Sequence, residues 1–174
     1  MIALFKELIT NQYQASLATV ANCIEHCPDS HWNLPVARYP FSQSVFHTLF
    51  YADYYLETAA ERVQVQLFHR ENRELFADYE QLKDIEPMAV YTREQLRTYR
   101  QFCQKKVIGS LEVETVESLA APAQFPRKNF SRAELHVYNI RHIQHHAAQL
   151  ILRLRLDTDV DVPWYRSGSA DFSR

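Results

Sequence analysis

Glycine is scarce in this chain: only two occur among 174 residues, Gly109 and Gly168. Tight hairpins, phosphate-binding loops and dinucleotide-binding motifs need glycine where φ is positive or where the backbone must approach closely. A nucleophile elbow, which presents a catalytic serine on a sharp turn, depends on glycine for the same reason. The scarcity therefore argues against a nucleotide-binding protein or a serine hydrolase and favours an all-α fold.

The chain also lacks the features of exported and membrane-inserted proteins. Its three cysteines, Cys23, Cys27 and Cys103, are an odd number and do not form a CxxC motif, so we expect reduced, packed thiols. The segment beginning at Met1 has neither the basic start nor the apolar run of a signal peptide. No stretch approaches the roughly 18 apolar residues of a membrane span. We expect a cytoplasmic protein without membrane contact.

Charge of one sign is not concentrated anywhere. The net charge is -2, and the densest basic group, Arg141, Arg153 and Arg155, lies in the same segment as a histidine cluster. A nucleic-acid binder carries a basic face, so we expect no nucleic-acid partner. The length fits one domain, which we place at 1–165, with 166–174 as a flexible tail.

Apolar residues recur at spacings of three and four, as on one face of a helix. Thr92 with Gln95, and Ser131 with Glu134, have the spacing of a capping box, and Ser42 is a candidate N-cap. We predict four long helices, over 2–26, 43–66, 93–107 or beyond, and 132–156. Such helices imply an antiparallel bundle with ligands bound in its core.

Two connections between these helices contain prolines. Residues 29–40 include Trp32 and are predicted to form an ordered loop across one end of the bundle. Residues 67–91 have a weaker apolar pattern, which indicates a long connection with one short helix. Long loops in compact domains often cover a functional site.

A histidine cluster at 142–146, His-Ile-Gln-His-His, is the most informative stretch. Residues four apart on a helix point the same way, so His142 and His146 can bind one metal ion. At about 100° per residue, these two flank the apolar stripe of the helix and His145 lies farther out. We predict His142 and His146 as ligands. The three candidate roles of His145 are hydrogen-bonding to a ligand, shuttling protons and lying at the surface, and the last fits its position best.

His47 is the candidate third ligand, because it lies in the most apolar helical segment. Burying an unpaired imidazole is unfavourable, so His47 is either hydrogen-bonded in the core or bound to metal. The presence of His142 and His146 favours the metal. Three neutral nitrogen ligands with an open position are typical of a catalytic site. Asp53 and Glu57 are candidates to orient a ligand or act as a base, or else they are solvated.

The HxxxH spacing also occurs in zinc proteases, where a glutamate follows the first histidine and activates water. Here Ile143 follows His142, which argues against peptide hydrolysis. The other histidines show no comparable pairing, and we interpret them as structural or surface residues: His26, His31, His69 and His136.

Three stretches together resemble the DinB/YfiT-like superfamily: FHTLFYADYYL at 46–56, RHIQHHAAQL at 141–150 and VPW at 162–164. The resemblance spans about 4–164. It implies an up-up-down-down four-helix bundle, commonly a homodimer, in which three histidines hold a divalent metal. Carried over by position, these ligands are His47, His142 and His146.

Members of that family include transferases that join a low-molecular-weight thiol to an electrophile, thiol-dependent isomerases and hydrolase-like proteins. The resemblance therefore implies a metal-dependent enzyme, with Zn²⁺ or Ni²⁺ the expected ions and a small molecule, such as a thiol, as substrate. The alternative is a non-catalytic bundle that binds a ligand or a partner. An aromatic-rich second helix and the lack of an obvious general base favour this alternative.

Overall fold

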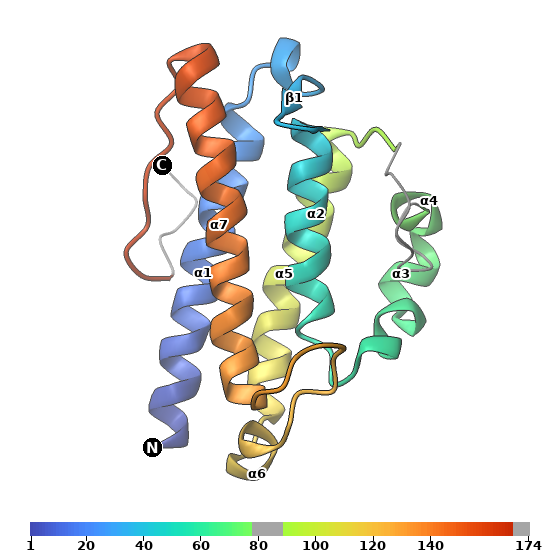
Figure 1. Ribbon diagram of the computed structural model, residues 1–174, viewed down its shortest axis with the longest axis vertical. Helices are drawn as coiled ribbons and strands as arrows, with labels where there is room; N and C mark the ends of the chain where they lie inside the picture. The colour runs from blue at the N-terminus through green and yellow to red at the C-terminus, as the bar shows by residue number, and fades with distance from the viewer. Residues whose placement is uncertain (78–88, 169–174) are drawn as a thin grey trace.

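The computed structural model describes residues 1–77 and 89–168, and this part of the chain is mostly helical (Figure 1). The long helices are α1 (Ile2–His26), α2 (Phe41–Tyr54), α5 (Arg93–Val113) and α7 (Arg132–Thr158). The short ones are η1 (Asp29–His31), η2 (Ala60–Val65), α3 (Leu67–Glu71), α4 (Arg73–Phe76) and α6 (Val116–Ala120). Two short strands, β1 (Pro35–Val36) and β2 (Tyr39–Pro40), pair in an antiparallel hairpin. The predicted all-α class is confirmed.

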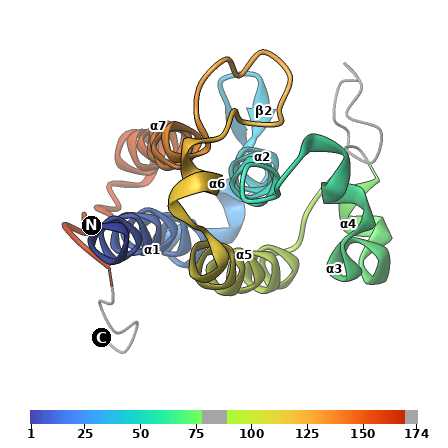
Figure 2. The same ribbon diagram turned by 90° about the horizontal axis from the view of Figure 1, so that it is seen from below.

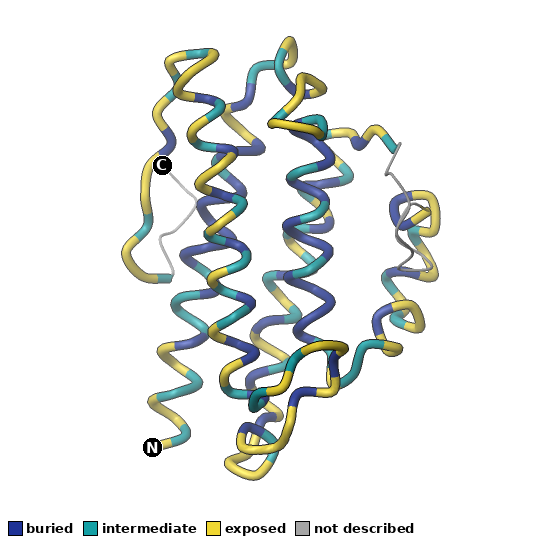
Figure 3. Tube along the Cα trace, in the orientation of Figure 1, coloured by how far each residue is buried: buried dark blue, intermediate teal, exposed yellow. Residues whose placement is uncertain are grey.

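The four long helices pack around one apolar core. Both α5 and α7 contact α1 and α2, so α1 and α2 stand at opposite corners of the bundle (Figure 2). The inward faces are buried and the outward faces are exposed (Figure 3). Large side chains fill the core, among them Tyr13, Phe46, Phe50 and Tyr99. None of the helices in the described ranges has both the length and the apolar composition needed to cross a bilayer.

The helix directions correct the expected up-up-down-down order. Figure 1 shows α1 and α7 rising while α2 and α5 descend, so the order along the chain is up-down-down-up. Hydrogen bonds between α1 and α7 advance together along both helices, as parallel helices require: Tyr13 with His136 and Ser16 with Gln144. The connection over 27–40 is short and reverses the chain, whereas the one over 55–92 is long enough to return it to the same end.

The helix caps were predicted in part. The side chains of Thr92 and Ser131 each accept a hydrogen bond from the backbone three residues on, as predicted. The N-cap predicted at Ser42 is wrong. Pro40 occupies that position in α2, and the Ser42 hydroxyl instead donates to Asn33 Oδ1 at 3.0 Å.

α2 ends at Tyr54, well before the predicted 66. The buried guanidinium of Arg132, from the first turn of α7, donates to the backbone carbonyls that follow the helix, those of Tyr55, Leu56 and Glu57. Carbonyls at a helix end need partners outside the helix. Here the partner lies far away in the sequence, so no local pattern shows where α2 stops.

After α2 the chain leaves the bundle and forms η2, α3 and α4 beside α5 (Figures 1 and 2). Two short helices thus occupy the start of the predicted 67–91 connection, while 78–88 lie outside the described residues.

Beyond α7 the chain returns along α1, where Asn22 donates to the Tyr165 hydroxyl at 2.6 Å. A Cβ at Gly168 would lie 2.8 Å from the Asn11 carbonyl oxygen. Residues 166–168 of the predicted tail therefore lie against α1, and 169–174 fall outside the described part.

Candidate metal centre

The three histidines predicted as ligands come together where α2 packs against α7. The ring centroid of His47 lies 5.6 Å from that of His142 and 4.8 Å from that of His146. One nitrogen from each of the three rings lies within 4.8 Å of the others, and all three residues are half-buried. The four-residue spacing aligns two rings on α7, and the antiparallel packing of α2 supplies the third.

The two α7 histidines have the nitrogen spacing of ligands that share one divalent cation. Nε2 of His142 and Nε2 of His146 are 3.2 Å apart. Two nitrogens bound to Zn²⁺ at about 2.0–2.1 Å with a tetrahedral angle lie about 3.3 Å apart. This group could therefore hold a metal ion, although imidazole nitrogens suit several first-row metals and do not select one.

Burial keeps these imidazoles neutral. It lowers the pKa of His47 to about 4, with a further contribution from His146. It lowers the pKa of His142 to about 3, with contributions from His146 and His47. Burial also lowers the pKa of His146, against the opposing effect of a hydrogen bond with Gln149. All three rings are thus uncharged at neutral pH, each with one nitrogen free to bind a metal.

The lowered pKa values of the three histidines predict how metal affinity depends on pH. Protons compete for the ligand nitrogens only as the pH falls through each pKa of the metal-free folded protein. Because these pKa values are all lowered, we expect the Zn²⁺ dissociation constants at pH 7.5 and pH 6.0 to agree within about threefold. A site of three imidazoles with ordinary pKa values would instead bind Zn²⁺ about fiftyfold more weakly at pH 6.0 than at pH 7.5. The measurement is a competition titration with a chelator at the two pH values. A fall in Zn²⁺ affinity near fiftyfold would contradict the lowered pKa values of the three histidines.

Gln149 orients one of the rings. Its Oε1 lies 3.1 Å from Nδ1 of His146, and its amide nitrogen lies 3.1 Å from Nε2 of His145. A proton held on Nδ1 leaves Nε2 of His146 as the ligand atom. His145 is exposed, as predicted, and its contact with Gln149 is an outer link in this chain of hydrogen bonds.

We expect Gln149→Leu to weaken Zn²⁺ binding about 10- to 100-fold, because outer hydrogen bonds that orient ligands typically have effects of this size. The side chain is exposed, so the fold should not change. Gln144→Leu is the matched control on the same helix, since Gln144 hydrogen-bonds Ser16 instead. Equal Zn²⁺ affinities of Gln149→Leu and the unaltered protein in a chelator competition would refute the orienting role.

Tyrosines line one side of the three-histidine group. The ring of Tyr51 lies 4.8 Å from that of His47 and 5.3 Å from that of His142. The ring centroid of Tyr55 lies 6.3 Å from that of His142. These rings hold the imidazoles by packing and make an apolar wall beside the ligand nitrogens.

Asp53 and Glu57, the candidate base or ligand-orienting residues, lie elsewhere. Asp53 is fully buried and accepts hydrogen bonds from His69 at 2.6 Å and Tyr99 at 2.9 Å. Lys106 forms ion pairs with both carboxylates at 2.5 Å. Burial raises the pKa of Asp53, but the His69 hydrogen bond and the Lys106 charge outweigh it, so the pKa lies below its usual value. Asp53 therefore joins α2 to α3 and α5, and Glu57 joins the segment after α2 to α5, so neither serves the three histidines of the candidate site.

The remaining histidines are structural or peripheral, as interpreted. His69 pairs with Asp53, and the fully buried His136 lies 3.2 Å from the Tyr13 hydroxyl and 3.4 Å from a Glu114 oxygen. His26 is exposed. The three cysteines are free and buried, in agreement with the expected packed thiols.

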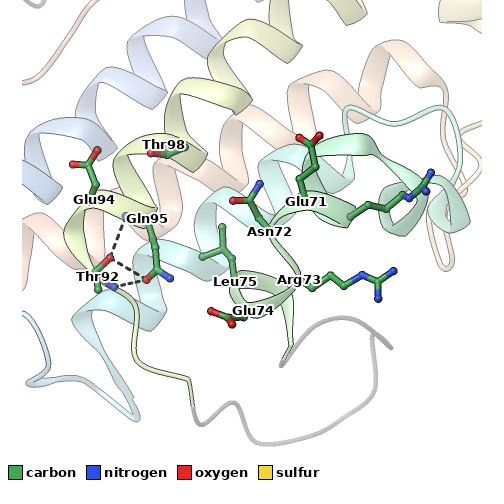
Figure 4. A pocket seen from close by; sticks show the side chains of 10 residues that line it. Glu71, Asn72, Arg73, Glu74, Leu75, Thr92, Glu94, Gln95 and Thr98 are labelled. Carbon is green, nitrogen blue, oxygen red and sulfur yellow. Dashed lines mark hydrogen bonds between the residues drawn. The ribbon is translucent and has the colours of Figure 1, made fainter.

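A pocket of about 530 Å³ lies between the α3–α4 segment and the start of α5 (Figure 4). Among the residues that the structure describes, its lining mixes charges of both signs and contains neither histidine nor cysteine. The segment lies beyond α2 and α5 as seen from α7 (Figure 2), and so away from the three imidazoles. The side chains that line it are Arg70, Glu71, Asn72, Arg73, Glu74, Leu75, Thr92, Glu94, Gln95 and Thr98.

Comparisons of the chain with protein-family models, with curated proteins and with solved structures give no match. The resemblance to the DinB/YfiT-like superfamily therefore stays a prediction from the quoted sequence stretches.

Proposed function

We propose that this chain is a metal-dependent enzyme of the DinB/YfiT-like class that transfers a thiol or water to a small electrophilic substrate. The observation that carries the proposal is the convergence of His47, His142 and His146, whose ligand nitrogens lie within 4.8 Å of one another. We propose Zn²⁺ or Ni²⁺ as the bound ion. A homodimer in the cytoplasm is the setting that the resemblance and the sequence composition suggest.

Each side chain of the candidate site has a separate role in this proposal. The three neutral imidazoles would hold the ion, which would take a substrate atom as a further ligand. A bound divalent ion lowers the pKa of a thiol or water, which gives a nucleophile at neutral pH. Gln149 fixes the proton of His146 on Nδ1. Tyr51 and Tyr55 shield one side of the imidazoles from water.

The test is turnover by the metal-loaded protein with a panel of small thiols and an activated aryl halide, followed by absorbance of the thioether product. We expect product formation that stops with a chelator and returns when the ion is restored. His142→Ala should show no turnover above the uncatalysed reaction. Turnover that is insensitive to chelator would contradict the proposal.

One observation favours a second candidate, a non-catalytic bundle that binds a ligand. Asp53 on α2 and Glu57 just after it, the carboxylates that could act as a base, are both engaged with Lys106. Stoichiometric metal binding without turnover for any thiol, electrophile or hydrolysable ester would support this candidate.

A further inference from the structure

A loop over 121–131, between α6 and α7, places a lysine over two tyrosine rings, one of which packs against the three-histidine group. In Figure 2 this loop, drawn in orange, lies outside α2 and α7 on the side where the two helices meet. Its ends are joined by backbone hydrogen bonds, from Ala123 to Phe130 at 2.9 Å and from Arg132 to Ala121 at 2.8 Å. The loop is thus a closed, anchored turn.

Lys128 is held at one position within this loop. Its backbone N–H donates to the Phe125 carbonyl at 3.2 Å, and the buried Phe125 ring packs on Tyr55 at 5.5 Å. The preceding residue, Arg127, has a positive φ of 60°. Residues other than glycine adopt this left-handed conformation uncommonly, and here it belongs to the turn that holds Lys128 in place.

The ammonium of Lys128 lies over two tyrosine rings, of which that of Tyr55 packs against His142. Nζ is 4.5 Å from the ring centroid of Tyr138 and 5.6 Å from that of Tyr55. Tyr138 precedes His142 by one helical turn on α7, and Tyr55 contacts the His142 ring at 6.3 Å. The Lys128 charge is also among those that lower the pKa of His142, which agrees with this proximity.

This ammonium has no anionic partner. Within residues 1–77 and 89–168, the side chain of Lys128 makes no ion pair or hydrogen bond, and its polar head contacts only the two rings. A lysine ammonium has three donors, and a tyrosine ring satisfies none of them as an oxygen would. The side chain is half-buried, so the charge is partly removed from water.

The metal ligands add no negative charge either. The group consists of three imidazoles, without a carboxylate or thiolate among the described residues. A divalent ion bound there would keep its full charge, and Lys128 would add one more beside it. Excess positive charge in a partly desolvated site favours an anionic ligand.

We propose that Lys128, with Tyr55 and Tyr138, forms a carboxylate-binding subsite of the metal centre, so that the substrate is a small molecule carrying both a carboxylate and the reacting group. This inference rests on the proposed function, because it assigns the substrate class of the same site. Lys128 donates to the carboxylate, and the two rings set its position.

The experiment measures thiol binding to the Co²⁺-loaded protein, from the absorption band of a cobalt-bound thiolate, and needs no turnover. The probes are 3-mercaptopropionate, neutral 2-mercaptoethanol and cationic cysteamine. We expect the unaltered protein to bind 3-mercaptopropionate most tightly. In Lys128→Met its affinity should fall about tenfold, as for a hydrogen bond to a charged group, while that of 2-mercaptoethanol stays within about twofold. Lys128→Arg should retain most of the preference.

Lys105→Met, which removes an exposed charge from α5, is the matched control and should leave the preference unchanged. An equal fall in Lys105→Met and Lys128→Met would overturn the subsite, because net charge alone would then explain the preference. Unchanged selectivity in Lys128→Met would overturn it as well. Failure of Co²⁺ to bind the unaltered protein would instead refute the proposed function, and the cobalt spectrum without thiol separates the two outcomes.

Discussion

Replacing His142 by alanine should weaken Zn²⁺ binding by roughly 70- to 900-fold. Zinc sites with four protein ligands have binding free energies of about 10–16 kcal/mol, so one ligand accounts for about 2.5–4 kcal/mol. His47→Ala should have a similar effect, although His47 lies on a different helix. The measurement is competition for Zn²⁺ with a chromophoric chelator.

Two histidine variants serve as controls. His26→Ala removes an exposed imidazole at the end of α1 and should leave the affinity unchanged. His145→Ala removes the outer link to Gln149 and a ring contact with His146, but no ligand, and should have a smaller effect than His142→Ala. If His47→Ala and His142→Ala both bind Zn²⁺ as tightly as the unaltered protein, the three-histidine group is not the metal site.

Asp53→Ala should lower the free energy of unfolding by about 3–5 kcal/mol, as expected when one partner of a buried ion pair is removed. The substitution leaves the His69 ring, the Tyr99 hydroxyl and the Lys106 ammonium without their shared acceptor. Because the pKa of Asp53 is lowered, its stabilising effect is present above the unfolded-state pKa near 4 and is lost as the pH falls through the folded value. Urea unfolding at pH 7 measures the loss.

Asp161→Ala is the matched control for this prediction, because Asp161 is exposed and its ion pair, with Arg155, lies at the surface. We expect no measurable change in its unfolding midpoint. Asp53→Ala that still folds should keep its Zn²⁺ affinity, since the Asp53 cluster lies apart from the imidazoles. A destabilisation of Asp53→Ala as small as that of Asp161→Ala would show that the cluster is not a stabilising one.

The helices that the sequence predicted best are those with local signals. The Thr92–Gln95 capping box marks the start of α5, and a periodic apolar face predicted the last helix as far as 156, two residues short of the end of α7 at Thr158. The end of α2 was missed because Arg132, distant in the sequence, satisfies the carbonyls that follow Tyr54. The order of helix directions was also wrong, because periodicity describes single helices and does not specify which of them become neighbours.

The candidate site was predicted where helix geometry alone sufficed. The spacing of His142 and His146 brings their Nε2 atoms to 3.2 Å, and the apolar surroundings of His47 pointed to a special role. Asp53 was misinterpreted because its partners, such as Lys106, come from other helices. Lys128 gave no signal in the sequence, since its position depends on how a closed loop packs on α2 and α7.

X-ray absorption at the metal edge of the Zn²⁺-loaded protein tests the central claim most directly. We predict three imidazole nitrogens at about 2.0–2.1 Å from the ion, completed by a water or thiol ligand. In His47→Ala the number of imidazole nitrogens around the ion should fall to two, those of His142 and His146. A shell of oxygen ligands alone, or a spectrum that does not change in His47→Ala, would contradict the assignment of these three histidines as the metal site.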